Sequence, residues 1–181
     1  MRRALLAGLP LVLALSPVVA APDEAQAPRP FEITVLGETV APAEVEKERG
    51  CALGSPTGDW TLATAGIAGE GEGADSSALS VLEARSGAVK QSVRVYRMSG
   101  PCWAPDGSYF VFGEGGIVKA AAPGLTPSVL WQDPSAPRGG IFPARVMNFR
   151  WGTAMRTLSF LYVDDPAKEN PSVSLVTLTV K

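Results

Sequence analysis

The chain carries the stretch CWAPDGSYFVF at residues 102–112. Its first residues end one apolar segment, and its last residues begin an aromatic-rich one. The tetrapeptide APDG at residues 104–107 suits a type I turn, because its proline presets φ at the second position and its glycine tolerates the geometry that follows. Residues 109–112 are an unbroken run of β-formers, which predicts a strand covered on both faces.

The same pattern recurs on either side of this stretch. Residues 53–63 align with residues 102–112 at a spacing of 49 between both their prolines and their glycines. Residues 150–160 form a third copy, in which Trp151 follows Trp103 by 48 residues. The third copy keeps the tryptophan and the following strand but lacks the proline and glycine of the turn. The sequence therefore predicts three repeated units.

A period near 48 is on the scale of β-propeller blades, which run to roughly 40–50 residues. Alternating hydrophobicity and turn signals predict four strands in each of the first two units and three in the last. The predicted strands are residues 49–53, 60–67, 78–84 and 90–95, then 97–103, 109–112, 117–121 and 128–131, then 145–151, 157–163 and 173–180. The expected fold class is all-β, with three four-stranded propeller-like blades.

The last blade is one strand short, and one strand, Phe31–Val35, is left over at the front of the chain. A terminal strand that completes the last blade hides its edge hydrogen-bonding groups. Natural propellers use about four to eight blades, so three blades form an open arc whose ends lie far apart. One interpretation is that this strand completes the last blade of a second copy in a head-to-tail homodimer. The alternative is a compact monomer in which the sheets relax into a sandwich or loops cover the edges.

The units resemble the TolB-like propeller repeat, whose signature is a Trp-Ser-Pro-Asp-Gly turn followed by a hydrophobic strand. Residues 103–107, WAPDG, match it with Ala104 in place of serine, and residues 55–58, SPTG, match it more weakly. The resemblance covers roughly residues 49–181. It implies export to the bacterial periplasm, all-β blades and binding to other envelope proteins. It departs from the family in having half of the usual six blades and no preceding α/β domain.

The first residues predict an export signal. A basic start, an apolar core over residues 4–15 and small residues ending in Val18-Val19-Ala20 are typical of a Sec signal peptide cleaved after Ala20. A membrane anchor is the alternative, but the apolar core falls short of the ~20 residues that span a bilayer. We expect a flexible linker at residues 21–30, a β-repeat domain at residues 31–181, and a periplasmic or secreted protein. Residues 42–50 fit either a short helix or a lead into the strand at 49–53.

The chain has two cysteines, Cys51 and Cys102. An even count in an exported chain favours a disulfide between them, with two buried free thiols as the alternative. The chain has no Cys-x-x-Cys motif, so a redox role is not indicated.

Histidine is absent, which excludes Ser-His-Asp and Cys-His nucleophile systems and histidine-based zinc sites. Two cysteines cannot form a four-thiolate zinc site, and no phosphate- or dinucleotide-binding loop motif is present. The formal net charge of −2, with no cluster of lysines and arginines, argues against nucleic acid and anionic lipid. We expect no catalytic residues, metal or cofactor.

Four glycine-rich or acidic segments fit turns and loops. Residues 113–116, GEGG, fit a hairpin turn, and residues 69–75, GEGEGAD, fit a solvated loop better than a calcium loop. Asp106 and the pair Asp164-Asp165 are explained by turn chemistry. The aromatic residues fall mostly at matching strand positions, which favours packing between blades over a ligand cage; they are Trp60, Trp103, Tyr109, Phe110, Phe112, Trp131, Trp151, Phe160 and Tyr162.

These observations predict an exported, non-enzymatic module that binds a protein or other cell-envelope component. The competing hypotheses are a hydrolase or lyase built on carboxylates, such as Glu72 or Asp164, and a binder of small ligands or carbohydrate that uses aromatic residues on one rim.

Overall fold

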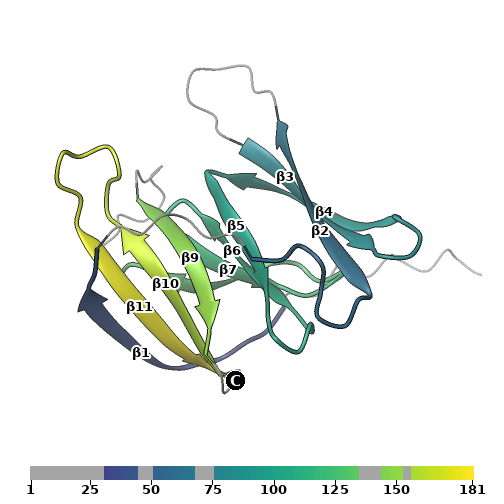
Figure 1. The fold of residues 1–181 in the computed structure, drawn as a ribbon, viewed down its shortest axis with the longest axis horizontal. Helices are drawn as coiled ribbons and strands as arrows, with labels where there is room; N and C mark the ends of the chain where they lie inside the picture. Colours follow the sequence, from purple (N-terminus) through teal and green to yellow (C-terminus); the bar gives the residue numbers. More distant parts are fainter. Residues whose placement is uncertain (1–30, 45–50, 68–75, 135–143, 153–155) are drawn as a thin grey trace, which may run out of the picture.

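The structure is a computed structural model that describes residues 31–44, 51–67, 76–134, 144–152 and 156–181. The predicted signal peptide and linker lie outside these residues. The described part is all-β, as predicted, with strands in three open antiparallel sheets (Figure 1).

Sheet I contains β2 (Trp60–Ile67), β3 (Ser76–Glu83) and β4 (Val89–Tyr96). Sheet II contains β5 (Met98–Trp103), β6 (Phe110–Glu114), β7 (Ile117–Ala121) and β8 (Ser128–Gln132). Sheet III has the order β1 (Val35–Pro42), β11 (Val173–Val180), β10 (Thr157–Val163) and β9 (Arg145–Trp151).

Sheet II lies between the other two (Figure 1). Phe110 and Phe112 on β6 pack into one cluster with Leu62 and Leu79 of sheet I. Val111, between them, points to the opposite face and joins the larger cluster shared with sheet III. All three β6 residues are at most 1 % exposed, which confirms the prediction of a strand covered on both faces.

The three units share one backbone hydrogen bond across the turn. The N–H of Ser55 donates to the carbonyl of Trp60, that of Ala104 to Tyr109 and that of Gly152 to Thr157, each at 2.8 Å. These donors follow one another at the sequence spacings of the repeat. The first two units also contain the predicted four-residue turn, because Gly58 and Gly107 donate to Ser55 and Ala104 at 2.9 Å. Both glycines have φ above +70°, a conformation that costs glycine little.

Sheets II and III also share a β-bulge. Three residue steps on β5, from Ser99 to Cys102, face two steps on β6, and three steps on β9, from Met147 to Arg150, face two on β10. The extra residue lies at positions 100–101 in one sheet and 148–149 in the other, again 48 residues apart. The repeat therefore preserves backbone geometry where the side chains have diverged.

Sheet I has three strands in the described residues, so the prediction of four strands in the first unit is wrong for this part of the chain. Residues 49 and 50 of the predicted strand 49–53 lie outside the description. Of the rest, Gly54 makes an isolated bridge to Thr61, and the carbonyl of Leu53 accepts from Leu62 at 2.9 Å.

The front strand is shifted from its predicted position. It spans Val35–Pro42, because these residues pair with β11. Phe31 and Ile33 instead pack against the large cluster, and the N–H of Phe31 donates to Thr126 at 2.8 Å. The apolar alternation from Phe31 to Val35 correctly signalled burial, but it did not mark the hydrogen-bonded ladder.

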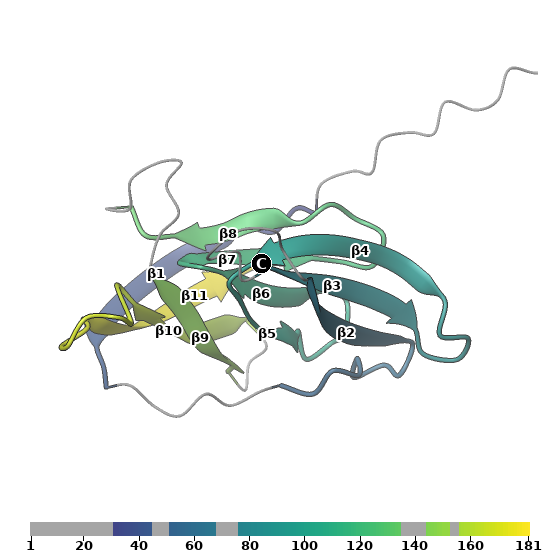
Figure 2. The ribbon, with the colours of Figure 1, turned by 90° about the horizontal axis from the view of Figure 1, so that it is seen from above.

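The front strand also completes the last sheet within its own chain, which corrects the expectation that it cannot reach it. Sheets II and III are packed face to face, and β1 lies beside β8 (Figure 2), where Trp131 Nε1 donates to Glu38 at 2.9 Å. The chain between Pro42 and Trp60 is long enough to cross back to sheet I. The head-to-tail homodimer stays a prediction, and it would now require β1 to exchange between copies.

The predicted disulfide joins Cys51 to Cys102, with a Cα–Cα distance of 5.1 Å. It ties the segment before β2 to β5 of sheet II, across a sequence separation of 51 residues. A link of this length typically contributes ~2–4 kcal/mol by restricting the unfolded chain. The bond is consistent with an oxidising, non-cytoplasmic location.

A substitution at Gly113 tests how closely sheets II and III approach each other. A Cβ at this position would overlap the Ser99 hydroxyl oxygen and a methyl carbon of Val146. We therefore expect Gly113→Ala to lower the free energy of unfolding by about 1–3 kcal/mol through overpacking, as measured by urea denaturation.

Gly66 on β2 provides the matched control, because a Cβ there meets no atom within 4 Å. Gly66→Ala should leave stability unchanged or raise it slightly. Equal effects of the two substitutions would contradict the proposed packing.

Candidate functional site

The turns of the first two units meet at one end of the sheets. Gly107 approaches Thr57 so closely that a Cβ would lie 2.9 Å from the Thr57 methyl carbon. Asp106 Oδ1 accepts hydrogen bonds from the Ser108 N–H at 3.0 Å and the Ser108 hydroxyl at 2.7 Å. Asp106 is therefore a turn-stabilising residue, as the sequence indicated.

A pocket of about 300 Å³ opens beside these turns. We call it the turn-end pocket; its lining residues are Leu36, Asp106, Tyr109, Arg156, Val180 and Lys181. Two cationic side chains, one carboxylate and one phenol thus surround a space with apolar walls. Its volume is at the lower end of the range for ligand pockets, about 300–1,000 Å³.

Tyr109 is fixed between two other aromatic rings. Its ring centroid lies 5.1 Å from that of Phe31 and 5.7 Å from that of Trp151. Burial, and secondarily the nearby Asp106 carboxylate, raises the pKa of Tyr109 to about 12. The phenol therefore stays protonated at neutral pH and can donate a hydrogen bond.

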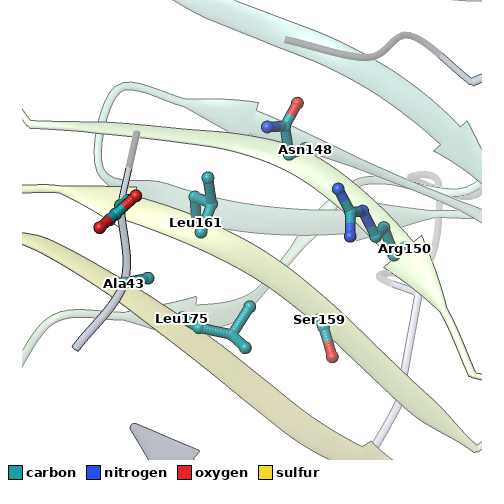
Figure 3. A pocket seen from close by; sticks show the side chains of 7 residues that line it. Ala43, Asn148, Arg150, Ser159, Leu161 and Leu175 are labelled. Carbon is teal, nitrogen blue, oxygen red and sulfur yellow. The ribbon is translucent and has the colours of Figure 1, made fainter. Parts of the chain in front are cut away.

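A second, smaller pocket of about 210 Å³ lies on sheet III (Figure 3). We call it the outer-face pocket; it is lined by Ala43, Glu44, Asn148, Arg150, Ser159, Leu161 and Leu175. Leu161 and Leu175 alternate with Phe160 and Val176 of the core and pair across β10 and β11. The pocket is therefore on the face of sheet III that points away from sheet II.

Among the residues that line this pocket, Asn148 has an unusual backbone conformation. Its φ is +56°, within the β-bulge of β9, and its side chain is only 5 % exposed. Bulges of this kind redirect side chains and are frequent near functional sites. Asparagine tolerates this left-handed conformation better than most residues other than glycine.

The acidic segments have mostly structural surroundings. Asp164 accepts from the N–H groups of Asp165 and Ser172 at 2.7 and 2.9 Å and pairs with Lys168 at 2.9 Å. The hydrogen bond from Lys168 holds the pKa of the partly exposed Asp164 carboxyl below its usual value. Residues 113–116 form the predicted hairpin, since Glu114 and Ile117 are paired around a two-residue loop. Residues 69–75, including Glu72, lie outside the described residues.

The aromatic side chains named from the sequence pack between the sheets. Trp103, Phe110, Phe112, Trp131 and Phe160 are buried. Trp60, Tyr109, Trp151 and Tyr162 are partly buried against the same two clusters. Trp131, for example, makes edge-to-face contacts with Phe160 and Tyr162 at 5.1 and 5.3 Å. The packing interpretation of these residues is confirmed.

Within the described ranges, no three aspartate, glutamate or cysteine side chains gather closely enough to hold a metal ion. No helix in the same residues has the length and apolar character needed to cross a membrane.

Comparison with models of known families found no match, and searches of curated proteins and of solved structures found none either. The arrangement of this chain's own residues is therefore the basis for any functional proposal.

Sequence reasoning did not identify the cationic residues of either pocket. Arg156 and Lys181 approach Leu36 only because β1 pairs with β11. Arg150 and Glu44 line one pocket only because the residues after β1 lie over the outer face of sheet III. No motif links these residues. The repeat gave one signal for the bulge at Asn148, because it aligns this residue with Gly100 in the bulge of the preceding unit.

Asn148 supports a test of its backbone conformation. Both Asn148→Ala and Asn148→Gly remove the amide, but only alanine places a Cβ at positive φ. We expect Asn148→Ala to be less stable than Asn148→Gly by about 1 kcal/mol, as measured by denaturant unfolding.

Ser92, an exposed position on β4 with ordinary strand geometry, is the control. There the order should reverse, with Ser92→Gly less stable than Ser92→Ala. The same order at both positions would argue against a strained bulge at Asn148.

Proposed function

We propose that this chain is an exported, non-enzymatic β-repeat module, periplasmic or secreted, that binds a protein or other cell-envelope component. One observation carries the proposal. Most of the large hydrophobic side chains that are exposed in the described residues lie on the outermost strand of a sheet. They are Val89 and Tyr96 on β4, Val129 on β8, and Leu36 and Val40 on β1.

Each of these strands pairs with a neighbour on one side only, within the described residues. Such an edge offers unpaired backbone groups to an extended segment of another protein, which adds to the sheet as a further strand. Strand β8 has no charged residue, and β1 has one, Glu38. Charged residues on an edge normally discourage such pairing. These two edges are therefore the best candidates for the partner's contact.

Export is supported by the signal-like residues 1–20 together with the disulfide. The resemblance of residues 103–107 to the TolB-like turn supports a propeller-like ancestry and binding to envelope proteins. A non-enzymatic role is favoured because Asp106 and Asp164 are engaged in turn stabilisation and histidine is absent from the chain.

Capture from envelope extract tests the proposal, with residues 21–181 as bait. A discrete partner should bind the unsubstituted chain. The combined variant Val40→Lys/Val129→Lys should capture about tenfold less of this partner, because charged edge residues oppose strand addition. Both positions are more than half exposed, so the fold should be preserved.

Thr179→Lys is the matched control, because it adds the same charge at an exposed position on the internal strand β11. It should capture the partner normally. Failure to capture any partner, or equal loss with the control, would contradict edge binding. A substrate turnover that Asp164→Asn abolishes would favour the enzyme hypothesis instead.

The turn-end pocket favours a second candidate, the small-ligand binder. It combines a suitable volume with a protonated phenol and two cations.

A further inference from the structure

The turn-end pocket is assembled from four segments of the chain, which backbone hydrogen bonds hold in place. Thr34 and Lys181 exchange backbone hydrogen bonds at 3.2 and 3.0 Å, and the N–H of Val180 donates to the carbonyl of Arg156 at 2.8 Å. The tight turn of residues 104–107 supplies the opposite wall. These bonds set the positions of the lining residues before any ligand arrives, which lowers the entropic cost of binding.

The pocket has two cationic side chains without an ion-pair partner in the described part of the chain. Arg156 and Lys181 both line it, and neither side chain has an ion-pair partner among the described residues. The single carboxylate, Asp106, already accepts two hydrogen bonds from Ser108. The two cationic side chains are therefore available to an anionic ligand.

The remaining lining residues define the rest of the ligand. Leu36 is 60 % exposed and stands at the wall, while Val180 and the ring of Tyr109 supply apolar surface. The Tyr109 hydroxyl can donate to an acceptor. The indole N–H of Trp151, whose ring contacts Tyr109, is buried without a hydrogen-bond partner among the described residues.

We propose that the turn-end pocket binds a monocarboxylate attached to an apolar group, with Arg156 and Lys181 pairing the carboxylate and Leu36 contacting the apolar part. Asp106 would repel the second charge of a phosphate monoester, which favours a monoanion. Both a free organic acid and the carboxyl end of a peptide have this chemistry. The proposal does not rest on edge binding, since the edge variants Val40→Lys and Val129→Lys leave the lining residues intact.

The test is a titration of residues 21–181 with 3-phenylpropionate at pH 7, followed by calorimetry and by the NMR signal of the Trp151 indole N–H. We expect saturable binding with a Kd of about 1 mM or below, and no comparable binding of the uncharged 3-phenylpropanamide. Equal binding of the acid and the amide, or no saturation at ~10 mM acid, would overturn the proposal.

Single substitutions distinguish specific binding of the carboxylate in this pocket from a general effect of the protein's charge. Arg156→Gln and Lys181→Gln should each weaken binding by about tenfold, because each removes a charge-assisted contact. Both side chains are exposed, so folding should be unaffected. Arg85→Gln, which removes an exposed arginine in the turn between β3 and β4, should bind normally. Equal weakening by Arg85→Gln would overturn the assignment.

Leu36→Asp provides an independent variant that leaves both cations in place. The added carboxylate should abolish acid binding, and unchanged binding would also overturn the proposal. A short peptide ending in a leucine carboxylate then distinguishes the two sources. Tighter binding of this peptide than of 3-phenylpropionate assigns a peptide end, and the reverse assigns a free organic acid; both support carboxylate recognition.

Discussion

The fold depends on one strand that is buried on both faces. Phe110 and Phe112 of β6 face sheet I, and Val111 faces sheet III, each at most 1 % exposed. Because successive side chains of a strand point to opposite faces, these three consecutive residues contribute to both clusters. Sheet II is therefore the middle layer, and the two outer sheets bury their apolar faces against it. The disulfide adds a covalent link on the sheet III side, because Cys102 and Cys51 pack in the cluster that contains Val111.

This layering determines where binding surfaces can occur. The inward faces and most aromatic rings are occupied by packing, so the accessible features lie at the sheet edges, at the turn end and on the outer face of sheet III. The repeated turns serve as structural supports. Residues 104–107 contribute Asp106 to the turn-end pocket and position Tyr109 beside it. A stretch that stabilises the fold thus also forms one wall of the candidate site.

Much of the fold could be predicted from local sequence. The strands 60–67, 117–121, 145–151, 157–163 and 173–180 have the predicted bounds, because apolar alternation and turn residues mark both ends. The disulfide followed from the even count of cysteines in a chain predicted to be exported. The position of β1 could not be predicted in this way, because its ladder depends on the free edge of β11, about 140 residues away. Its own residues are largely exposed and carry little periodic signal.

The candidate sites were beyond sequence reasoning for the same reason. Arg156 and Lys181 are ordinary surface residues until the pairing of β1 with β11 brings Leu36 to them. Asn148 looks like an ordinary polar strand residue, and only its φ of +56° reveals the bulge.

Native-state hydrogen exchange at individual amides measures the central role of β6 most directly. If β6 holds the layers together, the amides of Val111 and Phe112 should exchange only through global unfolding and rank among the slowest in the protein. The amides of β1, which is exposed over most of its length, should exchange faster through local opening. Exchange of the β6 amides as fast as those of β1 would contradict the account.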